Sequence, residues 1–267
     1  MKEIYKRAIT GIIYVVLLLS AVFLNSDAFD FLFMAFGLAC LFEYKRIVKL
    51  KGYYVFVAYL ALWWAYIYLI QKEWIINILL VATLVTDILL LYFLLSKKEK
   101  VFTPIEKFLC GLLFLGGGCI FLTMIPYRGG GFEKILIMGI FILIWVNDSF
   151  AYLVGRKLGR TKLFPSVSPK KTIEGAAGGL VFALIAAYII SIFENNLSIL
   201  QWLILAIVIV VTGNLGDLIE SKFKRKAKVK DSGAILPGHG GIWDRLDSLV
   251  FAAPFAFLTL IIFSHVS

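Results

Sequence analysis

The longest polar segment of the chain is SKFKRKAKVKDSGAILPGHGGIWDRLD, which runs from Ser221 to Asp247. It stands in a sequence of which 61% of residues are hydrophobic and only 16% charged. Six basic residues precede Asp231, a Pro-Gly-His-Gly-Gly turn follows, and two aspartates three residues apart, Asp244 and Asp247, close the segment. Cations that hold phosphates, carboxylates that hold a metal and glycines that admit an anion to the backbone therefore occur together. This combination indicates phosphate chemistry beside a membrane.

The composition of the chain places it among membrane proteins, because soluble domains carry about 25% charged residues. A membrane-spanning helix needs about 20 predominantly apolar residues. The pattern therefore predicts an all-α polytopic membrane protein with about nine transmembrane helices. The nine apolar segments are 8–24, 28–42, 54–70, 74–95, 104–125, 132–155, 175–193, 198–219 and 246–264.

The placement of lysine and arginine predicts the orientation of these helices. With a cytoplasmic N-terminus, the inside loops hold all of the 27 basic residues except Lys72, Arg128 and Lys134. The positive-inside rule predicts such a partition. We therefore expect a cytoplasmic N-terminus and an outside C-terminus in the inner (plasma) membrane, with segment 8–24 retained as a helix because it lacks a clear cleavage site.

Two inside loops are long enough for chemistry, residues 155–174 and 220–245. The interpretation is a division into residues 1–130, about five structural and lipid-facing helices, and residues 131–267, about four helices that carry these loops on the cytoplasmic side. Three cysteines lie within apolar segments and are predicted to be small buried hydrophobic residues. They are Cys40, Cys110 and Cys119.

Acidic residues within apolar segments are functional candidates, because a charge in the bilayer is costly. Asp148 is the clearest, since it lies well inside segment 132–155. A structural role, as a helix–helix hydrogen bond or a pair with Arg156, stays open. Glu43 is instead predicted to form a surface ion pair, because Lys45 and Arg46 are its neighbours.

Two pairs of carboxylates predict a metal site. Asp217 has Asn214 three residues before it and Glu220 three residues after it, so the three share one helical face. Asp244 and Asp247 repeat this spacing at the start of the last segment. Carboxylate oxygens at two helix ends suit Mg²⁺, and a second cation is also compatible with the pattern. The alternative for Asp244 and Asp247 is stabilisation of the helix N-terminus, by about 0.3–1 kcal/mol.

The loop before segment 175–193 predicts an anion site. Ser168 suits an N-cap, Pro169 the first helical position, and Lys170 and Lys171 follow where helical amides point outward. A helix N-terminus with adjacent lysines binds phosphate. The alternative is contact between these lysines and lipid head groups.

The glycine-rich turn at residues 237–241 is a second candidate for phosphate binding. Its glycines, Gly238, Gly240 and Gly241, would let backbone amides approach an anion. A P-loop is excluded, because no Gly-Lys-Ser/Thr follows at the required spacing. His239 is interpreted first as a turn residue, then as a phosphate donor and last as a proton carrier.

Three sequence blocks together resemble the signature of the phosphatidate cytidylyltransferase family, also called CDP-diacylglycerol synthases. The main block joins residues 221–225, 230–233 and 236–247. Residues 147–152 with Gly155 and Gly159 form the second, and residues 168–172 with Glu174 and Gly175 form the third. Ile173 stands where the family usually has an aromatic residue. The blocks cover the C-terminal half of the chain.

The resemblance implies transfer of a cytidylyl group from CTP to phosphatidate with Mg²⁺, giving CDP-diacylglycerol and pyrophosphate. Asp217 and Asp244 would hold the metal, and Glu220 is a further candidate ligand. The catalytic candidates are Asp148, Asp217, Asp244, Asp247, Lys230 and His239. The residues expected at the CTP triphosphate and the lipid phosphate are Ser168, Lys170, Lys171, Lys224, Arg225, Gly238, Gly240, Gly241 and Arg245.

Other functions stay open from the sequence alone. A CTP-dependent enzyme with another lipid substrate, such as a polyprenol kinase or an ether-lipid cytidylyltransferase, would have similar head-group contacts. An ion-coupled transporter would use Asp148 and Asp217 as an ion path and predicts two inverted halves with broken helices. A lipid-binding scaffold would not explain the carboxylates. The expected partners are CTP, phosphatidate and the bilayer, with no nucleic acid, and a homodimer is compatible with the pattern.

Overall fold

The computed structural model describes residues 2–96, 100–128, 130–194, 196–236, 238 and 240–266. Two π-helical turns, at residues 65–69 and 110–117, continue the helices before them, and a 3-10 turn covers residues 125–127. The chain is built almost wholly of helices. They are α1 (Lys2–Leu24), α2 (Ser26–Val48), α3 (Tyr54–Trp64), η1 (Ala65–Leu69), α4 (Glu73–Leu95), α5 (Pro104–Leu109), η2 (Cys110–Gly117), α6 (Gly118–Met124), η3 (Ile125–Tyr127), α7 (Lys134–Leu158), α8 (Ile173–Phe193), α9 (Ile199–Lys226) and α10 (Trp243–Val266).

Local capping sequences fix where several helices begin. Asn25 accepts a hydrogen bond from the amide of Ala28 at the start of α2, at 2.6 Å. A reciprocal capping box joins Ser198 and Gln201 at the start of α9. Thr103 begins α5 in the same way. These side chains satisfy amides that the first helical turn leaves without partners, so short polar links separate long apolar helices.

Each of the nine predicted apolar segments lies in a helix or in a run of consecutive helices, and extends at most two residues beyond its ends. Among the residues that the structure describes, six helices are long and apolar enough to cross a membrane, and two shorter apolar ones cover residues 10–24 and 54–69. The helical, multi-pass character of the chain is therefore confirmed, while nine spans and the orientation of the termini stay predictions. The six are Glu73–Leu95, Pro104–Tyr127, Lys134–Leu158, Ile173–Phe193, Ile199–Lys226 and Trp243–His265.

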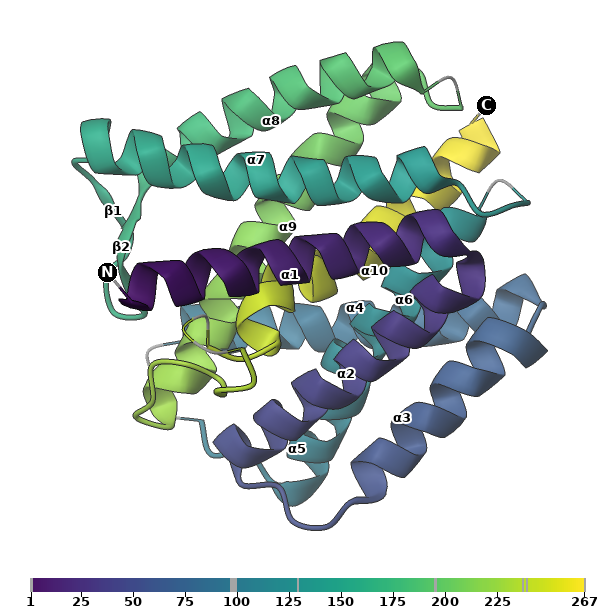
Figure 1. Ribbon diagram of the computed structural model, residues 1–267. Helices are drawn as coiled ribbons and strands as arrows, with labels where there is room; N and C mark the ends of the chain where they lie inside the picture. The colour runs from purple at the N-terminus through teal and green to yellow at the C-terminus, as the bar shows by residue number, and fades with distance from the viewer. Residues whose placement is uncertain are drawn as a thin grey trace.

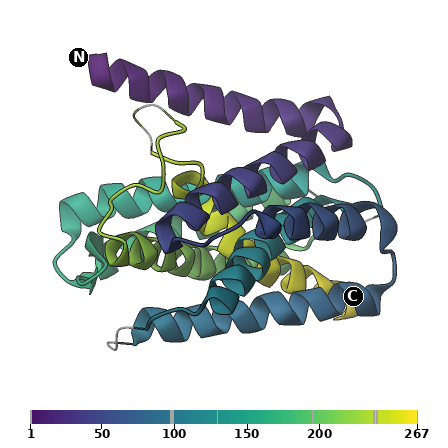
Figure 2. The same ribbon diagram turned by 90° about the horizontal axis from the view of Figure 1, so that it is seen from below.

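The helices pack so that polar segments gather at one end of the molecule. Helix α7 packs along α8, and α9 packs along α10. The hairpin after α7, the loop after α9 and the first residues of α1 lie at the same end in both views (Figures 1 and 2). The last residues of α10 lie at the opposite end (Figure 1).

The segment before α8 forms a hairpin rather than the predicted helix entry. Strand β1 (Lys162–Phe164) pairs antiparallel with β2 (Ser168–Thr172). Thr172 caps α8, because its hydroxyl accepts a hydrogen bond from the amide of Gly175 at 3.1 Å. The prediction that Ser168 is the N-cap was therefore wrong. The strand pairing keeps residues 168–172 extended and delays the helix to Ile173.

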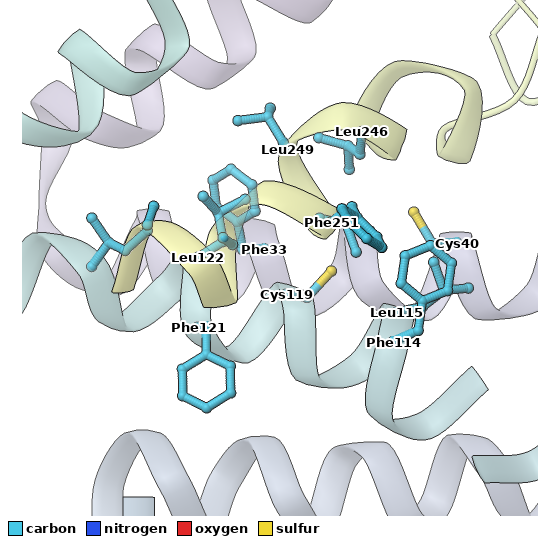
Figure 3. Packing of buried hydrophobic residues seen from close by; sticks show 14 of the residues in the cluster. Phe33, Cys40, Phe114, Leu115, Cys119, Phe121, Leu122, Leu246, Leu249 and Phe251 are labelled. Carbon is cyan, nitrogen blue, oxygen red and sulfur yellow. The ribbon is translucent and has the colours of Figure 1, made fainter. Parts of the chain in front are cut away.

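Buried aromatic side chains fix the end of α10 that carries the aspartates. Trp243 is fully buried and meets the ring of Tyr44 on α2, with 5.6 Å between centroids, and that of Phe114 on η2, with 6.3 Å. Cys40 and Cys119 lie among the phenylalanines and leucines of this core (Figure 3), which confirms the prediction that they are small buried hydrophobic residues. Cys110, for which the same was predicted, is only partly buried. Aromatic packing of this kind holds α2, η2 and α10 in fixed relation.

Candidate active site

A cavity of about 910 Å³ collects most of the residues predicted for the site. Helices α7, α9 and α10, the β hairpin and the loop after α9 line it. Of the predicted residues, Asp148, Lys170, Lys171, Asp217, Glu220, Lys224, Arg225, Lys230, Asp244, Arg245 and Asp247 lie in its wall. Sequence reasoning did not assign Arg156, Lys162, Asp231 or Ser248 to this site, and all four lie in the wall. Asn214, which it placed on one helical face with Asp217 and Glu220, lies there too.

Three carboxylates in this wall face one another. Asp217, Glu220 and Asp247 each place one oxygen within 4.8 Å of the other two. Asp217 and Glu220 share a face of α9, and Asp247 comes from α10. The two helices approach closely at Gly216, where an added Cβ would stand only 2.6 Å from the carbonyl oxygen of Asp247. We call these three residues the carboxylate cluster.

Asp244 also lines the cavity, but hydrogen-bond donors surround its carboxylate. Its Oδ1 lies 2.6 Å from Nζ of Lys224. Its Oδ2 accepts from the amide of Ser232 at 2.8 Å and from the amide of Gly241 at 2.7 Å. Asp244 therefore fastens the loop after α9 to the start of α10, and its assignment to the metal stays a prediction.

Lys224 lies between the two groups of carboxylates. Its ammonium is 2.6 Å from Glu220 and 2.6 Å from Asp244, and its side chain is only 10% exposed. Glu220 is fully buried, and its Oε1 has no hydrogen-bond partner in the part of the chain that the structure describes. Two carboxylates already engage the charge of Lys224, which was predicted to bind substrate phosphate.

Basic side chains also line the cavity. Lys171 on β2 pairs with Asp217 at 2.5 Å, and Lys170 precedes it in the same wall. Arg225 is oriented through its Nη1, which donates to the carbonyl of Val229 at 3.1 Å. The wall also includes Arg156, Lys162, Lys230 and Arg245.

Asp148 enters the same cavity from α7, 69 residues before Asp217 in the sequence. Its Oδ1 accepts a hydrogen bond from the amide group of Asn147 at 3.1 Å. The structure gives no ion pair between Asp148 and Arg156, the structural alternative, among the residues that it describes. Asp148 is therefore placed for a role in the cavity.

The glycines of the predicted phosphate turn lie beside the cavity rather than in its wall. Gly238 and Gly240 adopt φ values of 80° and 86°, which disfavour any other residue. At Gly240 an added Cβ would also stand 2.6 Å from Oδ2 of Asp244. Ser168 is likewise absent from the wall. His239 lies outside the described residues.

Glu43 lies in a different environment from the one that the sequence predicted. It lies on α2, it is fully buried, and no described lysine or arginine pairs with it, so the predicted surface ion pair was wrong. Its carboxylate accepts hydrogen bonds from the amides of Ile242 and Trp243, both at 2.9 Å. The only sequence signal was an acidic residue near the end of an apolar segment.

Comparison with known proteins gives the family of the chain. A sequence model described as "Cytidylyltransferase family" matches residues 5–263, nearly the whole chain. The chain belongs to this family. The match begins before α2, so the cytidylyltransferase family includes the N-terminal half, which the three sequence blocks did not cover.

Curated relatives carry a more specific name. The phosphatidate cytidylyltransferase of Bacillus subtilis (strain 168) is 35% identical over 274 residues, which cover 99% of this chain and 100% of the relative. The protein of the same name from Staphylococcus haemolyticus (strain JCSC1435) is 41% identical over 71% of this chain and 72% of the relative. Both relatives therefore carry the same name.

Proposed function

We propose that the chain is a phosphatidate cytidylyltransferase of the bacterial membrane. A phosphate oxygen of phosphatidate attacks the α-phosphorus of CTP, the bond from this phosphorus to the bridging oxygen breaks, and pyrophosphate leaves with that oxygen. The supporting observation is one charged cavity at an end of a bundle of apolar helices, lined by both a carboxylate cluster and basic side chains. Family membership and the names of the relatives favour this reaction.

The protein's own residues act by holding two anions in line. The attacking phosphate is already ionised, so the reaction needs no protein nucleophile. Lys170, Lys230 and Arg245 bind phosphate oxygens and balance the charge that grows on the departing pyrophosphate. Arg225 is held by the loop, so its guanidinium is oriented before substrate arrives. Asp148, in the part of the wall that α7 forms, orients the reacting phosphate groups.

The carboxylate cluster fits a divalent cation. Its oxygens lie within 4.8 Å of one another, and Oε1 of buried Glu220 has no other partner among the described residues. Mg²⁺ binds through a few carboxylates together with substrate phosphates. Asp217, Glu220 and Asp247 would hold it, and Asp244 would keep the adjoining loop in place. When bound, Mg²⁺ neutralises charge on the CTP phosphates.

The position of the cavity supports an active site at the membrane surface. The hairpin and loop that border it gather at one end of the bundle, where CTP would enter from water (Figure 1). The basic residues of these loops favour the cytoplasmic side of the inner membrane. A homodimer stays a prediction.

Pyrophosphate release from CTP by the purified protein in detergent tests this function. Turnover is expected only with CTP, phosphatidate and Mg²⁺ together, and CDP-diacylglycerol should form in equal amount. Asp30→Asn is a matched control. Asp30 is a buried carboxylate that accepts a hydrogen bond from the hydroxyl of Tyr127, and neither residue lies in the cavity wall.

The outcome also separates the alternatives. Turnover with an ether lipid in place of phosphatidate would keep the chemistry and change the substrate. Transfer of phosphate to a polyprenol would indicate a kinase. Absence of turnover with every lipid, in a protein that remains folded, would contradict the proposal.

A further inference from the structure

We propose that Glu43, on α2 in the N-terminal half, is a positioning residue for the active site. Its carboxylate holds the start of α10 and the loop after α9, and through them it fixes Asp244 and Lys224. The activity tests of this inference rest on the proposed function. Hydrogen exchange of the loop tests it independently of that function.

Glu43 acts first as a cap supplied from another helix. The amide of Ile242 donates to its Oε1 and that of Trp243 to its Oε2, both at 2.9 Å. Trp243 is the first residue of α10. Amides at a helix start lack intrahelical acceptors and carry partial positive charge. The Glu43 carboxylate satisfies both needs, which explains how this charge is tolerated while fully buried.

Ser232 connects Glu43 to Asp244. Its hydroxyl lies 2.6 Å from Oε2 of Glu43 and 3.0 Å from Oδ2 of Asp244. A hydroxyl has one hydrogen, and the shorter distance assigns it to Glu43. The backbone amide of Ser232 donates to Asp244 at 2.8 Å. One residue of the loop therefore ties a carboxylate of the N-terminal half to a carboxylate of the cavity.

Two glycines give Glu43 its access to the loop. An added Cβ at Gly241 would stand 2.1 Å from Oε2 of Glu43, and one at Gly233 would stand 2.4 Å from Oε1. Any side chain at either position would displace the carboxylate. The close packing of Tyr44 on Trp243, at 5.6 Å between ring centroids, holds α2 against α10 at the same place. The contact is therefore fixed from both helices.

The effect on the cavity follows from the chain of contacts. Asp244 binds the ammonium of Lys224, which also binds Glu220 of the carboxylate cluster. A loop freed from Glu43 would release Ser232 and the amide of Gly241, both donors to Asp244. Displacements of about 1 Å at a reacting centre cost roughly 100-fold in rate.

Three single variants and one double variant test this role. Glu43→Gln replaces one acceptor oxygen by a donor that faces an amide donor, and we expect kcat to fall roughly 10- to 100-fold. Glu43→Asp keeps the charge but shortens the side chain, so it should recover part of that loss. Ser232→Ala removes only the link, so we expect a loss of about 2- to 10-fold. The double variant Glu43→Gln/Ser232→Ala should be no slower than Glu43→Gln.

The control separates positioning from stability. Asp30→Asn removes another buried carboxylate from α2, about 20 Å along the helix from Glu43. It should lower the melting temperature without changing kcat. Amide hydrogen exchange of residues 230–242 should rise in Glu43→Gln and stay unchanged in Asp30→Asn.

Two results would overturn the inference. One is a folded Glu43→Gln protein with wild-type kcat, KM and loop exchange, and the other is additive losses in the double variant. If wild-type protein itself shows no turnover, the proposed function fails. Hydrogen exchange would then still decide whether Glu43 holds the loop.

Discussion

Asp244 and Asp247 lie one helical turn apart on α10 and face the same cavity, yet their surroundings are opposite. Donors surround Asp244, namely Lys224, Ser232 and the amide of Gly241. Asp247 instead faces two further carboxylates, Asp217 and Glu220. Equal spacing in sequence therefore does not mean equal chemistry. A carboxylate amid donors holds a loop, whereas carboxylates that repel one another mark a place for a cation.

The largest effect is expected at the carboxylate cluster. Asp217→Asn should lower turnover by more than about 100-fold, because the cluster loses a charged ligand where metal affinity depends on every group. The rate as a function of Mg²⁺ concentration checks this. An Asp217→Asn variant that keeps both the wild-type rate and the Mg²⁺ requirement would contradict the assignment of Asp217 as a metal ligand.

The second prediction compares the two aspartates directly. Asp247→Asn should raise the Mg²⁺ concentration for half-maximal rate by roughly 10- to 100-fold. Asp244→Asn should lower kcat while leaving that concentration unchanged, because its oxygens serve the loop. Parallel Mg²⁺ titrations of the two variants measure the difference. The same shift in both would show that they belong to one metal site, as the sequence had suggested.

The third prediction compares the two lysines that form ion pairs with these carboxylates, Lys224 and Lys171. Lys224→Gln leaves Glu220 and Asp244 buried without their cation, and should destabilise the protein by about 3–5 kcal/mol. Lys171→Gln breaks the pair with Asp217, whose side chain is 30% exposed, so the loss should stay below about 1 kcal/mol. Denaturation in detergent provides the measurement. Similar losses in both would contradict the burial difference.

The smallest effect is expected in the loop that Asp244 holds. Gly241→Ala should cost about 1–3 kcal/mol, because the new methyl group would strike Glu43 and the hydroxyl of Ser232. Gly131→Ala is the matched control, since an added Cβ there meets nothing within 4 Å. Thermal unfolding of the two variants should differ by several degrees. Equal melting temperatures would mean that the loop adapts without cost.

The sequence predicted much of the site because polar residues are conspicuous among apolar helices. Asp148, Asp217 and Asp247 were identified as functional candidates because a charge in such a segment requires a reason. Spacing of three residues on one helix placed Asp217 beside Glu220. The structure brings all four residues to one cavity wall. These inferences needed only helical periodicity and the cost of a buried charge.

The rest depended on contacts between distant parts of the chain. Glu43 meets Trp243, which lies 200 residues away, and nothing in its local sequence indicates that partner. The role of Asp244 depends likewise on Ser232 and Gly241 in a loop whose path the sequence does not define. Ser168 was misplaced because strand pairing, a nonlocal interaction, overrode local helix-start signals.

The contact between Glu43 and Ser232 also affects how the protein matures during translation. The two residues are separated by 189 positions. At about 5–20 residues per second, the ribosome adds Ser232 roughly 10–40 s after Glu43. Until then the newly made α2 has no partner for its carboxylate. The catalytic cavity therefore cannot be complete before the last helix emerges, and nascent chains that stop early should be inert toward nucleotide.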